Sequence, residues 1–140
     1  MTSDLNKKIP ASQFMFSGKE IETPYIKLKI ENGIIIGRFA DDLEMDLDIA
    51  KHCVEKRIEL CGGIPFALLA DMRGIRSISK EAREYLAVQG AHLVKAGALL
   101  TGSWLTRTLA NIFLSINRPA VPTKMFTDEA HAIEWLKKYE

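Results

Sequence analysis

The sequence predicts an α/β fold with a mixed sheet in the order ββαβαβαβα, in which the strands are mostly parallel after an N-terminal hairpin and four helices pack against the sheet. Three observations predict it: an alternating apolar hairpin at residues 26–39, two later apolar segments without alternation followed by a short edge strand, and helical repeats of apolar residues between them. We expect right-handed crossovers between the parallel strands. The 140 residues suit one domain, which we place at residues 21–140 after a loosely ordered arm at residues 1–20.

The predicted hairpin lies in the segment IKLKIENGIIIGRF. Ile26, Leu28 and Ile30 alternate with charged residues, and a second apolar run begins at Ile34. Between the two runs, Asn32-Gly33 is the strongest short hairpin signal, because both turn residues must accept a positive φ. The domain is therefore expected to open with two antiparallel strands.

The first helix is expected to begin near Asp46 and to end at Gly62-Gly63. The cysteines of this helix are eight residues apart, which separates their Cα atoms by about 12 Å. A disulfide needs Cα atoms within about 7 Å, so we expect reduced thiols and a cytoplasmic protein. The residues at helical spacing are Ala50, Cys53, Val54, Arg57, Ile58 and Cys61.

Three further strand–helix units are predicted after this helix. The apolar segments PFALLAD and AGALLT are typical of strands covered on both faces, whereas VPTKMFTD contains Pro122, which favours a sheet edge. Ser79, Ser103 and either Thr127 or Asp128 are expected to cap the three following helices. These units complete the predicted order.

The charge balance excludes several partners. Lys plus Arg number 19 and Asp plus Glu number 18, so we expect no nucleic-acid partner and no general attraction to anionic membranes. No apolar run approaches the ~18 residues of a membrane span, so none is expected, and residues 1–20 contain no apolar core of a signal peptide. Any anion-binding site must therefore depend on a local group of basic side chains and not on the net charge of the protein.

Polar and basic side chains follow two of the predicted parallel strands at their carboxyl ends. Open α/β sheets tend to bind ligands there, where helix N-termini offer free N–H groups to anions. We expect a basic rim that accepts a phosphate, a carboxylate or an acidic loop of a partner. The alternative is that the hydroxyls only cap helices and the basic side chains are only solvated. The rim consists of Arg73, Arg76, Ser77, Ser79 and Lys80 after one strand, and of Thr101, Ser103 and Arg107 after the next.

The segment SWLTRTLANIFLSIN predicts a helix whose outer face resembles an interface. At about 100° per residue, the core side carries Leu105, Leu109, Ile112, Phe113 and Ile116, and the outer side carries Trp104, Arg107, Asn111 and Leu114. Trp and Arg are enriched at the centres of protein interfaces. We therefore expect a protein partner or a homodimer at this helix. The alternative is that Trp104 packs over a neighbouring loop and Leu114 is singly exposed.

The sequence contains no recognisable catalytic or metal-binding set. The three histidines lack metal-ligand spacing with one another and with the cysteines, and no nucleophile elbow, dinucleotide motif or P-loop occurs. The acidic run DDLEMDLD fails the calcium-loop pattern, because Leu47 stands where Gly is needed and Cys53 stands where Glu is needed. We expect a protein that is not an enzyme and that uses no metal and no cofactor.

A family resemblance rests on the hairpin, on LLADMRGIRSIS and on LTRTLANIFLSINRPAVPTKMFTDEAHAIEWL. With these segments the chain resembles the SpoIIAA-like group of STAS-fold proteins, in particular its small uncharacterised bacterial members, over residues 24–139. The resemblance implies a mixed sheet with four packed helices, which agrees with the order predicted above. Its most specific residues are Arg107, Asn111, Pro119, Pro122, Phe126, Ala132, Trp135 and Leu136.

The better-known relatives in this group are anti-sigma factor antagonists, whose switch is a serine phosphorylated at the start of the helix after the third strand. Here Ser79 takes the capping position that Asp usually holds, and Lys80 takes the place of the phosphorylated serine, so we expect that the switch is lacking. A shifted register would bring Ser77 or Ser79 to that place, where a phosphate would lie near basic residues.

The resemblance and the absent catalytic set together predict a non-catalytic regulatory or protein-interaction module. The alternative is a module that binds a small anion, a nucleotide or a lipid. Its site would be the crevice at the carboxyl ends of the parallel strands.

Overall fold

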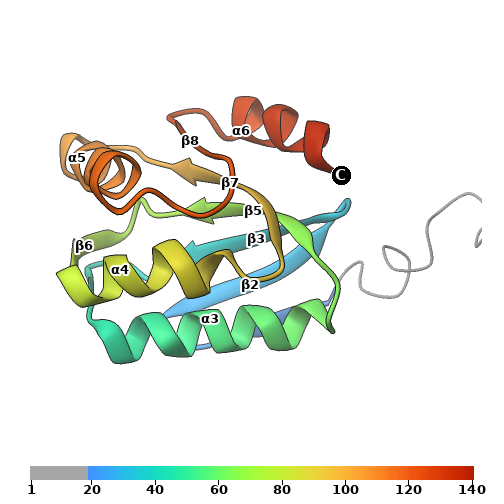
Figure 1. Ribbon diagram of the computed structural model, residues 1–140, viewed down its shortest axis with the longest axis horizontal. Helices are drawn as coiled ribbons and strands as arrows, with labels where there is room; N and C mark the ends of the chain where they lie inside the picture. Colours follow the sequence, from blue (N-terminus) through green and yellow to red (C-terminus); the bar gives the residue numbers. More distant parts are fainter. Residues whose placement is uncertain (1–18) are drawn as a thin grey trace, which may run out of the picture.

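The computed structural model describes residues 19–140, a mixed sheet with helices on both faces (Figure 1). Residues 1–18 of the expected N-terminal arm lie outside the described part, and Glu20 already begins the first strand. The strands are β1 (Glu20–Glu22), β2 (Ile26–Glu31), β3 (Ile34–Phe39), β4 (Leu43–Met45), β5 (Phe66–Asp71), β6 (Ile75–Ile78), β7 (Val94–Leu100) and β8 (Thr123–Phe126). The helices are α3 (Leu47–Cys61), α4 (Lys80–Val88), η1 (Gln89–Ala91), α5 (Trp104–Ile112), η2 (Phe113–Asn117), α6 (Glu129–Leu136) and η3 (Lys137–Tyr139).

Six of the described strands form one sheet in the order β1-β2-β3-β5-β7-β8. The pairs β1/β2 and β2/β3 are antiparallel, and the pairs β3/β5, β5/β7 and β7/β8 are parallel. This arrangement confirms the predicted mixed sheet, which is parallel after the hairpin. The strand β8 lies at the edge of the sheet, where the preceding Pro122 removes no hydrogen bond from a central ladder.

The hairpin turn has the predicted backbone. Asn32 has φ 52° and Gly33 has φ 79°, as the tight turn between β2 and β3 requires. This turn sets the register in which Ile30 faces Ile35 and Leu28 faces Gly37. The apolar side of β2 is therefore buried, and its charged side is exposed.

Side-chain oxygen atoms cap each of the four α-helices that the structure describes. Asp46 begins α3 by accepting the N–H of Ile49 at 2.9 Å, and Gly62, with φ 60°, ends that helix. Asp128, one of the two expected residues, caps α6. Local hydrogen bonds thus place the start of each helix near the residue that the sequence indicates.

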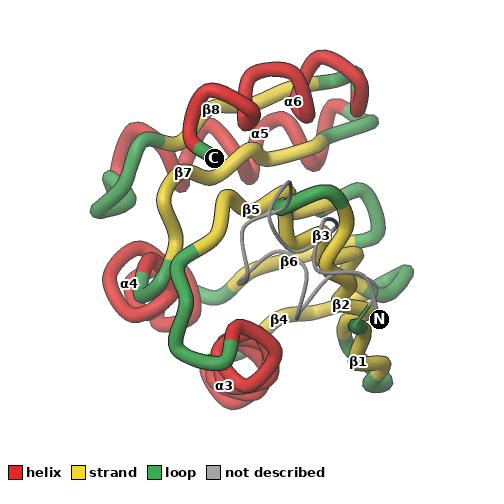
Figure 2. Tube along the Cα trace, turned by 90° about the vertical axis from the view of Figure 1, so that its right-hand side faces the viewer, coloured by secondary structure: helices red, strands yellow, loops and turns green. Residues whose placement is uncertain are grey.

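The helices divide between the two faces of the sheet. On one face, α6 packs through Ala132 and Leu136 against alternate residues of β3, β5 and β7. On the other face, α3, α4 and α5 cover the remaining alternate residues of the strands. Figure 1 shows α6 above the strands and α3 and α4 below them, and Figure 2 shows the same separation from a second side.

Three short strands were not expected. β1, β4 and β6 contain only three or four residues each, which is too short for an alternating pattern to be recognised. β4 and β6 pair in parallel as a separate two-stranded sheet next to α4. The predicted loops before α3 and α4 are therefore partly ordered strands.

Both cysteines are buried and neither forms a disulfide, as expected from their spacing in α3. Burial raises the pKa of the Cys53 thiol to about 12. Within residues 19–140, no helix combines the length and the apolar character that crossing a membrane requires.

Candidate functional site

Four charged side chains meet at the carboxyl ends of β3 and β5. We call them the four-charge cluster: Arg38, Asp71, Arg73 and Glu129. Arg38 Nη1 donates to Asp71 Oδ2 at 2.8 Å and to Glu129 Oε1 at 2.9 Å, and its Nη2 donates to Glu129 Oε2 at 3.0 Å. Arg73 donates to both oxygens of Asp71, from Nε at 2.9 Å and from Nη2 at 2.8 Å. The cluster therefore joins two strands, the loop after β5 and the first turn of α6.

The hydrogen bonds of the cluster shift the pKa values of its carboxyl groups. Burial alone would raise the pKa of Asp71, but the hydrogen bonds from Arg73 and Arg38 outweigh burial and hold it below its ordinary value. The pKa of Glu129 is lowered chiefly by the hydrogen bond from Arg38. Arg73, predicted to take part in an anion-binding rim, thus already binds a carboxylate, and its role as an anion ligand stays a prediction.

A polar depression of about 540 Å³ lies beside this cluster. Lys27, Arg38 and Arg73 supply its positive charges, and Asp41 and Asp71 supply negative ones. Because Asp71 already pairs with both arginines, Lys27 carries the positive charge that is least compensated within the depression. Of the predicted rim, only Arg73 lines this depression.

Arg76 and Ser77 belong to β6 rather than to a loop. Both are exposed, and Arg76 Nη2 lies 3.5 Å from Glu44 Oε2 of the neighbouring strand β4. In the register of that pair, Ser77 lies opposite Glu44. This part of the predicted basic rim therefore has an acidic neighbour, Glu44.

Ser79 caps α4 as the sequence predicts. Its hydroxyl accepts the N–H of Ala82 at 3.1 Å, and Lys80, the first residue of the helix, is exposed. Figure 1 shows α4 beginning at the end of the molecule where the strands β5 and β7 terminate. The neighbouring helix α5 contacts β6, which leads into Ser79. The two predicted helix starts therefore share one end of the fold.

Ser103 caps α5 through a reciprocal pair of hydrogen bonds. Its hydroxyl accepts the N–H of Thr106 at 3.1 Å, and the Thr106 hydroxyl accepts the N–H of Ser103 at 3.1 Å. A third bond joins Thr106 to the N–H of Gly102. Thr106 and Thr101 are buried, so the first turn of α5 is held by a network of hydroxyl and backbone groups.

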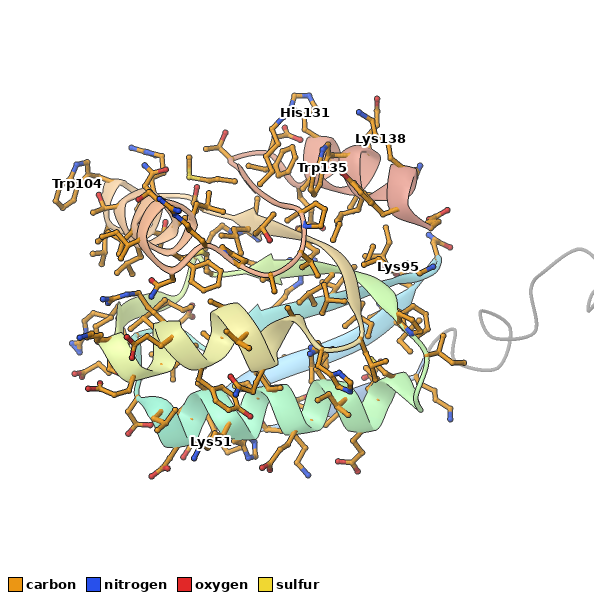
Figure 3. The ribbon with its side chains drawn as sticks, in the orientation of Figure 1. Lys51, Lys95, Trp104, His131, Trp135 and Lys138 are labelled. Carbon is orange, nitrogen blue, oxygen red and sulfur yellow. The ribbon has the colours of Figure 1, made fainter. Side chains whose placement is uncertain are left out.

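Trp104, Arg107 and Asn111 lie on one exposed face of α5, which we call the Trp104 surface. Trp104 is 74% exposed, and Figure 3 shows its side chain at the outer end of α5, directed away from the sheet. This exposure excludes, within the described residues, the alternative in which Trp104 packs over a loop. The neighbouring Leu105, predicted to lie in the core, is 38% exposed.

The end of α5 departs from the predicted helical repeat. Residues 113–117 form a π-helical turn in which the N–H of Arg118 bonds to the carbonyl of Phe113 at 3.0 Å. A π-helical turn takes more residues than an α-helical turn, so the side chains after it shift around the axis. Leu114, predicted on the outer face, packs on the core, and Ile116, predicted in the core, is 69% exposed. The predicted core side is displaced before the turn as well, because Thr106 and Ala110 are buried.

Sequence reasoning missed an apolar cavity of about 130 Å³ between the sheet and the helices α3, α4 and η2. Gly37, Ala70 and Gly97 contribute to its sheet side. A sequence signal existed, because small residues interrupt three otherwise apolar strands. Whether they leave a cavity depends on the opposing helices, which the strand sequences do not specify.

Among residues 19–140, no group of three or more His, Cys, Asp or Glu side chains is arranged to hold a metal ion. The side chain of His52 contacts the ring of Tyr25, with 5.3 Å between the ring centres. Within the described part, the structure therefore adds three features to the predicted site: the four-charge cluster, the polar depression and the apolar cavity.

Comparisons with known proteins place this fold. A family model described as domain of unknown function DUF7793 matches residues 28–140. No curated protein matches the chain. The crystal structure of an uncharacterised protein of the DUF3478 family from Shewanella loihica PV-4, with a SpoIIAA-like fold, is 16% identical, covers 85% of this chain and 99% of that chain, and has a TM-score of 0.59. That likeness confirms the SpoIIAA-like fold, and the match to the family model shows that the chain belongs to the DUF7793 family.

Proposed function

We propose that this protein is a non-catalytic regulatory module that binds a protein partner through the Trp104 surface. The observation that carries the proposal is the exposure of Trp104, 74% of which is accessible to solvent at the first residue of α5. A large aromatic side chain gains free energy when a partner buries it, and tryptophan is enriched among the residues that dominate binding.

The backbone of this surface is held before binding. The bonds between Ser103 and Thr106 fix the first turn of α5, which carries Trp104. A side chain on a fixed turn loses less conformational entropy on binding than one on a loop. Arg107 and Asn111 supply polar groups on the same exposed face of α5, as at the rim of known interfaces.

The charges near this surface indicate the chemistry of the partner. Arg107 lies on the same helix face as Trp104, and the exposed Lys80 begins α4 at the same end of the fold. A complementary partner presents an apolar pocket for the indole ring, flanked by carboxylate groups. A second copy of the chain is the other occupant that the experiment must distinguish.

The experiment compares two exposed apolar positions on the full chain. Trp104→Ser removes the proposed anchor, whereas Val88→Ser removes a side chain that is 65% exposed at the end of α4. Cross-linked partners are identified by mass spectrometry for the wild type and for both variants, and sedimentation velocity measures self-association.

We expect one defined complex that Trp104→Ser weakens by about tenfold or more and that Val88→Ser leaves intact. Charge reversal by Arg107→Glu is expected to weaken it further. A complex that both serine variants leave unchanged, or the absence of any complex with a strictly monomeric chain, contradicts the proposal.

The proposed module works without a phosphoserine switch. The exposed Lys80 stands where the resemblance expects the phosphorylated residue, and the Ser79 hydroxyl is occupied as a helix cap. Intact-mass measurement of the protein from its native cells is expected to show no phosphate. Phosphate that is lost in the Ser77→Ala plus Ser79→Ala variant would instead support the switch.

A second candidate function is the binding of a small anionic ligand in the polar depression. The guanidinium groups of Arg38 and Arg73 and the ammonium group of Lys27 line its volume of about 540 Å³. Titration calorimetry with inorganic phosphate and with a nucleoside monophosphate tests this function. Saturable binding that Lys27→Gln weakens and Trp104→Ser does not weaken would favour it.

A further inference from the structure

The apolar cavity is larger than an ordinary packing defect. Its volume is about 130 Å³, whereas protein interiors contain few voids larger than one water molecule. Apolar cavities of about 150 Å³ remain dry and bind benzene or xenon. The lining is almost wholly apolar and includes Leu68, Val54, Leu86 and Phe113, so it offers an apolar molecule a favourable environment.

Small residues on neighbouring strands create this space. In the sheet, Gly37 lies opposite Ala70, and Gly97 lies opposite Leu68. A methyl group at Gly97 would lie 3.6 Å from Thr123 Cγ2, an ordinary contact. Neither steric crowding nor a positive φ requires glycine at this position. The cavity therefore follows from the choice of side chains and not from the path of the backbone.

One buried cation, Arg57 of α3, lines the cavity and lacks a carboxylate partner. Arg57 is 4% exposed, and none of the described acidic residues forms an ion pair with it. Its Nη2 donates to the carbonyls of Gly90 at 3.2 Å and His92 at 2.8 Å, and its Nη1 contacts Cys61 Sγ at 3.8 Å. The partners of its guanidinium are thus uncharged oxygens and one thiol.

This environment differs from that of the arginines in the four-charge cluster, each of which binds a carboxylate. Burial lowers the pKa of Arg57 despite the nearby thiol of Cys61. A buried charge without a counter-charge is costly, and folding has already removed its water. An anion that reaches Arg57 therefore gains a charged hydrogen bond without desolvating the cation again.

We propose that the cavity binds a small carboxylic acid with an apolar body, whose carboxylate accepts hydrogen bonds from Arg57 while its hydrocarbon part lies beside Gly97. The volume suits a body of about one six-membered ring. This site lies between the sheet and the helices α3 and α4, separate from the Trp104 surface, so the proposal does not rest on the proposed function.

The segments at the outer side of the cavity indicate where the acid enters. Ala91 of η1 and Pro119 and Val121 of the loop after η2 line the cavity and are only half-buried. That loop follows the π-helical turn and is joined to α4 by the bond from Ala120 N–H to Ala87 carbonyl at 3.0 Å. A ligand that enters here passes between the loop and η1.

The test uses the full chain and three probes: benzoate, hexanoate and the neutral toluene. Binding is measured by titration calorimetry and by chemical-shift changes of the lining methyl groups. We expect saturable binding of at least one acid, tighter than that of toluene. Arg57→Met is expected to weaken acid binding by about tenfold or more, because it removes a charged hydrogen bond, while Arg76→Met, at an exposed arginine, leaves binding unchanged.

A second pair of variants guards against loss of the fold in Arg57→Met. Gly97→Ala adds one carbon atom to the cavity wall, and Gly97→Val adds three. Both are expected to weaken the binding of all three probes, Gly97→Val more than Gly97→Ala, while each variant still unfolds in a cooperative thermal transition. Toluene binding as tight as that of the tighter-binding acid, acid binding that survives Arg57→Met, or no binding of either acid at millimolar concentration would each overturn the proposal.

Discussion

Arg38 and Glu129 form a two-pronged ion pair, with Nη1 to Oε1 at 2.9 Å and Nη2 to Oε2 at 3.0 Å. The two residues are 91 positions apart in the chain, on β3 and at the start of α6. Since α6 covers one face of the sheet, this pair fixes the start of that helix against the carboxyl ends of the strands. A two-pronged pair of this kind stabilises the contact and also fixes the orientation of the two side chains relative to each other.

The replacement Arg38→Gln is expected to destabilise the fold by about 1 to 2 kcal/mol, because it breaks charged hydrogen bonds to both Asp71 and Glu129. Urea unfolding followed by circular dichroism measures the change. The control is Lys27→Gln, which breaks a 3.9 Å contact with Glu22 between two exposed side chains and should cost less than about 0.5 kcal/mol. Equal effects of the two changes would contradict the structural role of the cluster.

The acid dependence of stability follows from the same cluster. The pKa values of Asp71 and Glu129 are lower in the folded protein than their ordinary values. Their stabilising contribution is therefore complete above the unfolded pKa values, near 4, and is lost as the pH falls through the folded values. The urea midpoint should fall less steeply below about pH 4 in Arg38→Gln than in the wild type, and parallel pH profiles would disagree with this assignment.

Two glycines that line the apolar cavity should respond differently to alanine. At Gly97 the new methyl group would meet Thr123 at an ordinary 3.6 Å, whereas at Gly37 it would meet Ile26 and Leu28 side chains at 3.2 Å. We expect Gly97→Ala to raise the free energy of unfolding by about 0.5 to 1 kcal/mol. Gly37→Ala should be about 1 kcal/mol less stable than Gly97→Ala because its neighbours must move. The opposite order would contradict the tighter packing around Gly37.

Leu114 and Ile116 have the opposite environments to those that the sequence predicts, and this difference can be tested. Leu114→Ala should cost about 2 kcal/mol, because Leu114 packs on the core, whereas Ile116→Ala should cost less than about 0.5 kcal/mol, because Ile116 is exposed. Thermal unfolding of the two variants checks this. A larger loss at Ile116 would contradict the burial of Leu114 and the exposure of Ile116.

Much of the fold could be predicted because its signals are local. The Asn32-Gly33 turn and the caps at Asp46, Ser79 and Ser103 each depend on residues within one turn of the chain. The π-helical turn after α5 has no comparable signal, since its sequence also fits an α-helix. The predicted core side of this helix is also displaced before the turn, because Thr106 and Ala110 are buried there while Leu105 is exposed.

The candidate site could be predicted only in part. The sequence pointed to Arg73 and to the exposed Trp104, but it did not show that Asp71 and Glu129 neutralise the guanidinium groups near the strand ends. Those contacts join residues 33 and 91 positions apart, and pairing at such separation depends on the assembled sheet. Asp71, a lone acid at the end of an apolar strand, was the one sequence signal that could have suggested a charged partner.

The most direct test of the proposed function uses Trp104 as its own reporter. The chain has two tryptophans, and Trp135 packs against Phe126 and Tyr139, so Trp135→Phe leaves Trp104 as the one tryptophan of this chain. The same complex formed with Trp104→Ser plus Trp135→Phe gives the emission of the partner, which is subtracted. Its emission and its quenching by acrylamide are measured for the free chain and for the chain in its cross-linked complex. Binding at this surface predicts emission at shorter wavelength and strong protection from acrylamide in the complex. Unchanged emission and full quenching in that complex would contradict it.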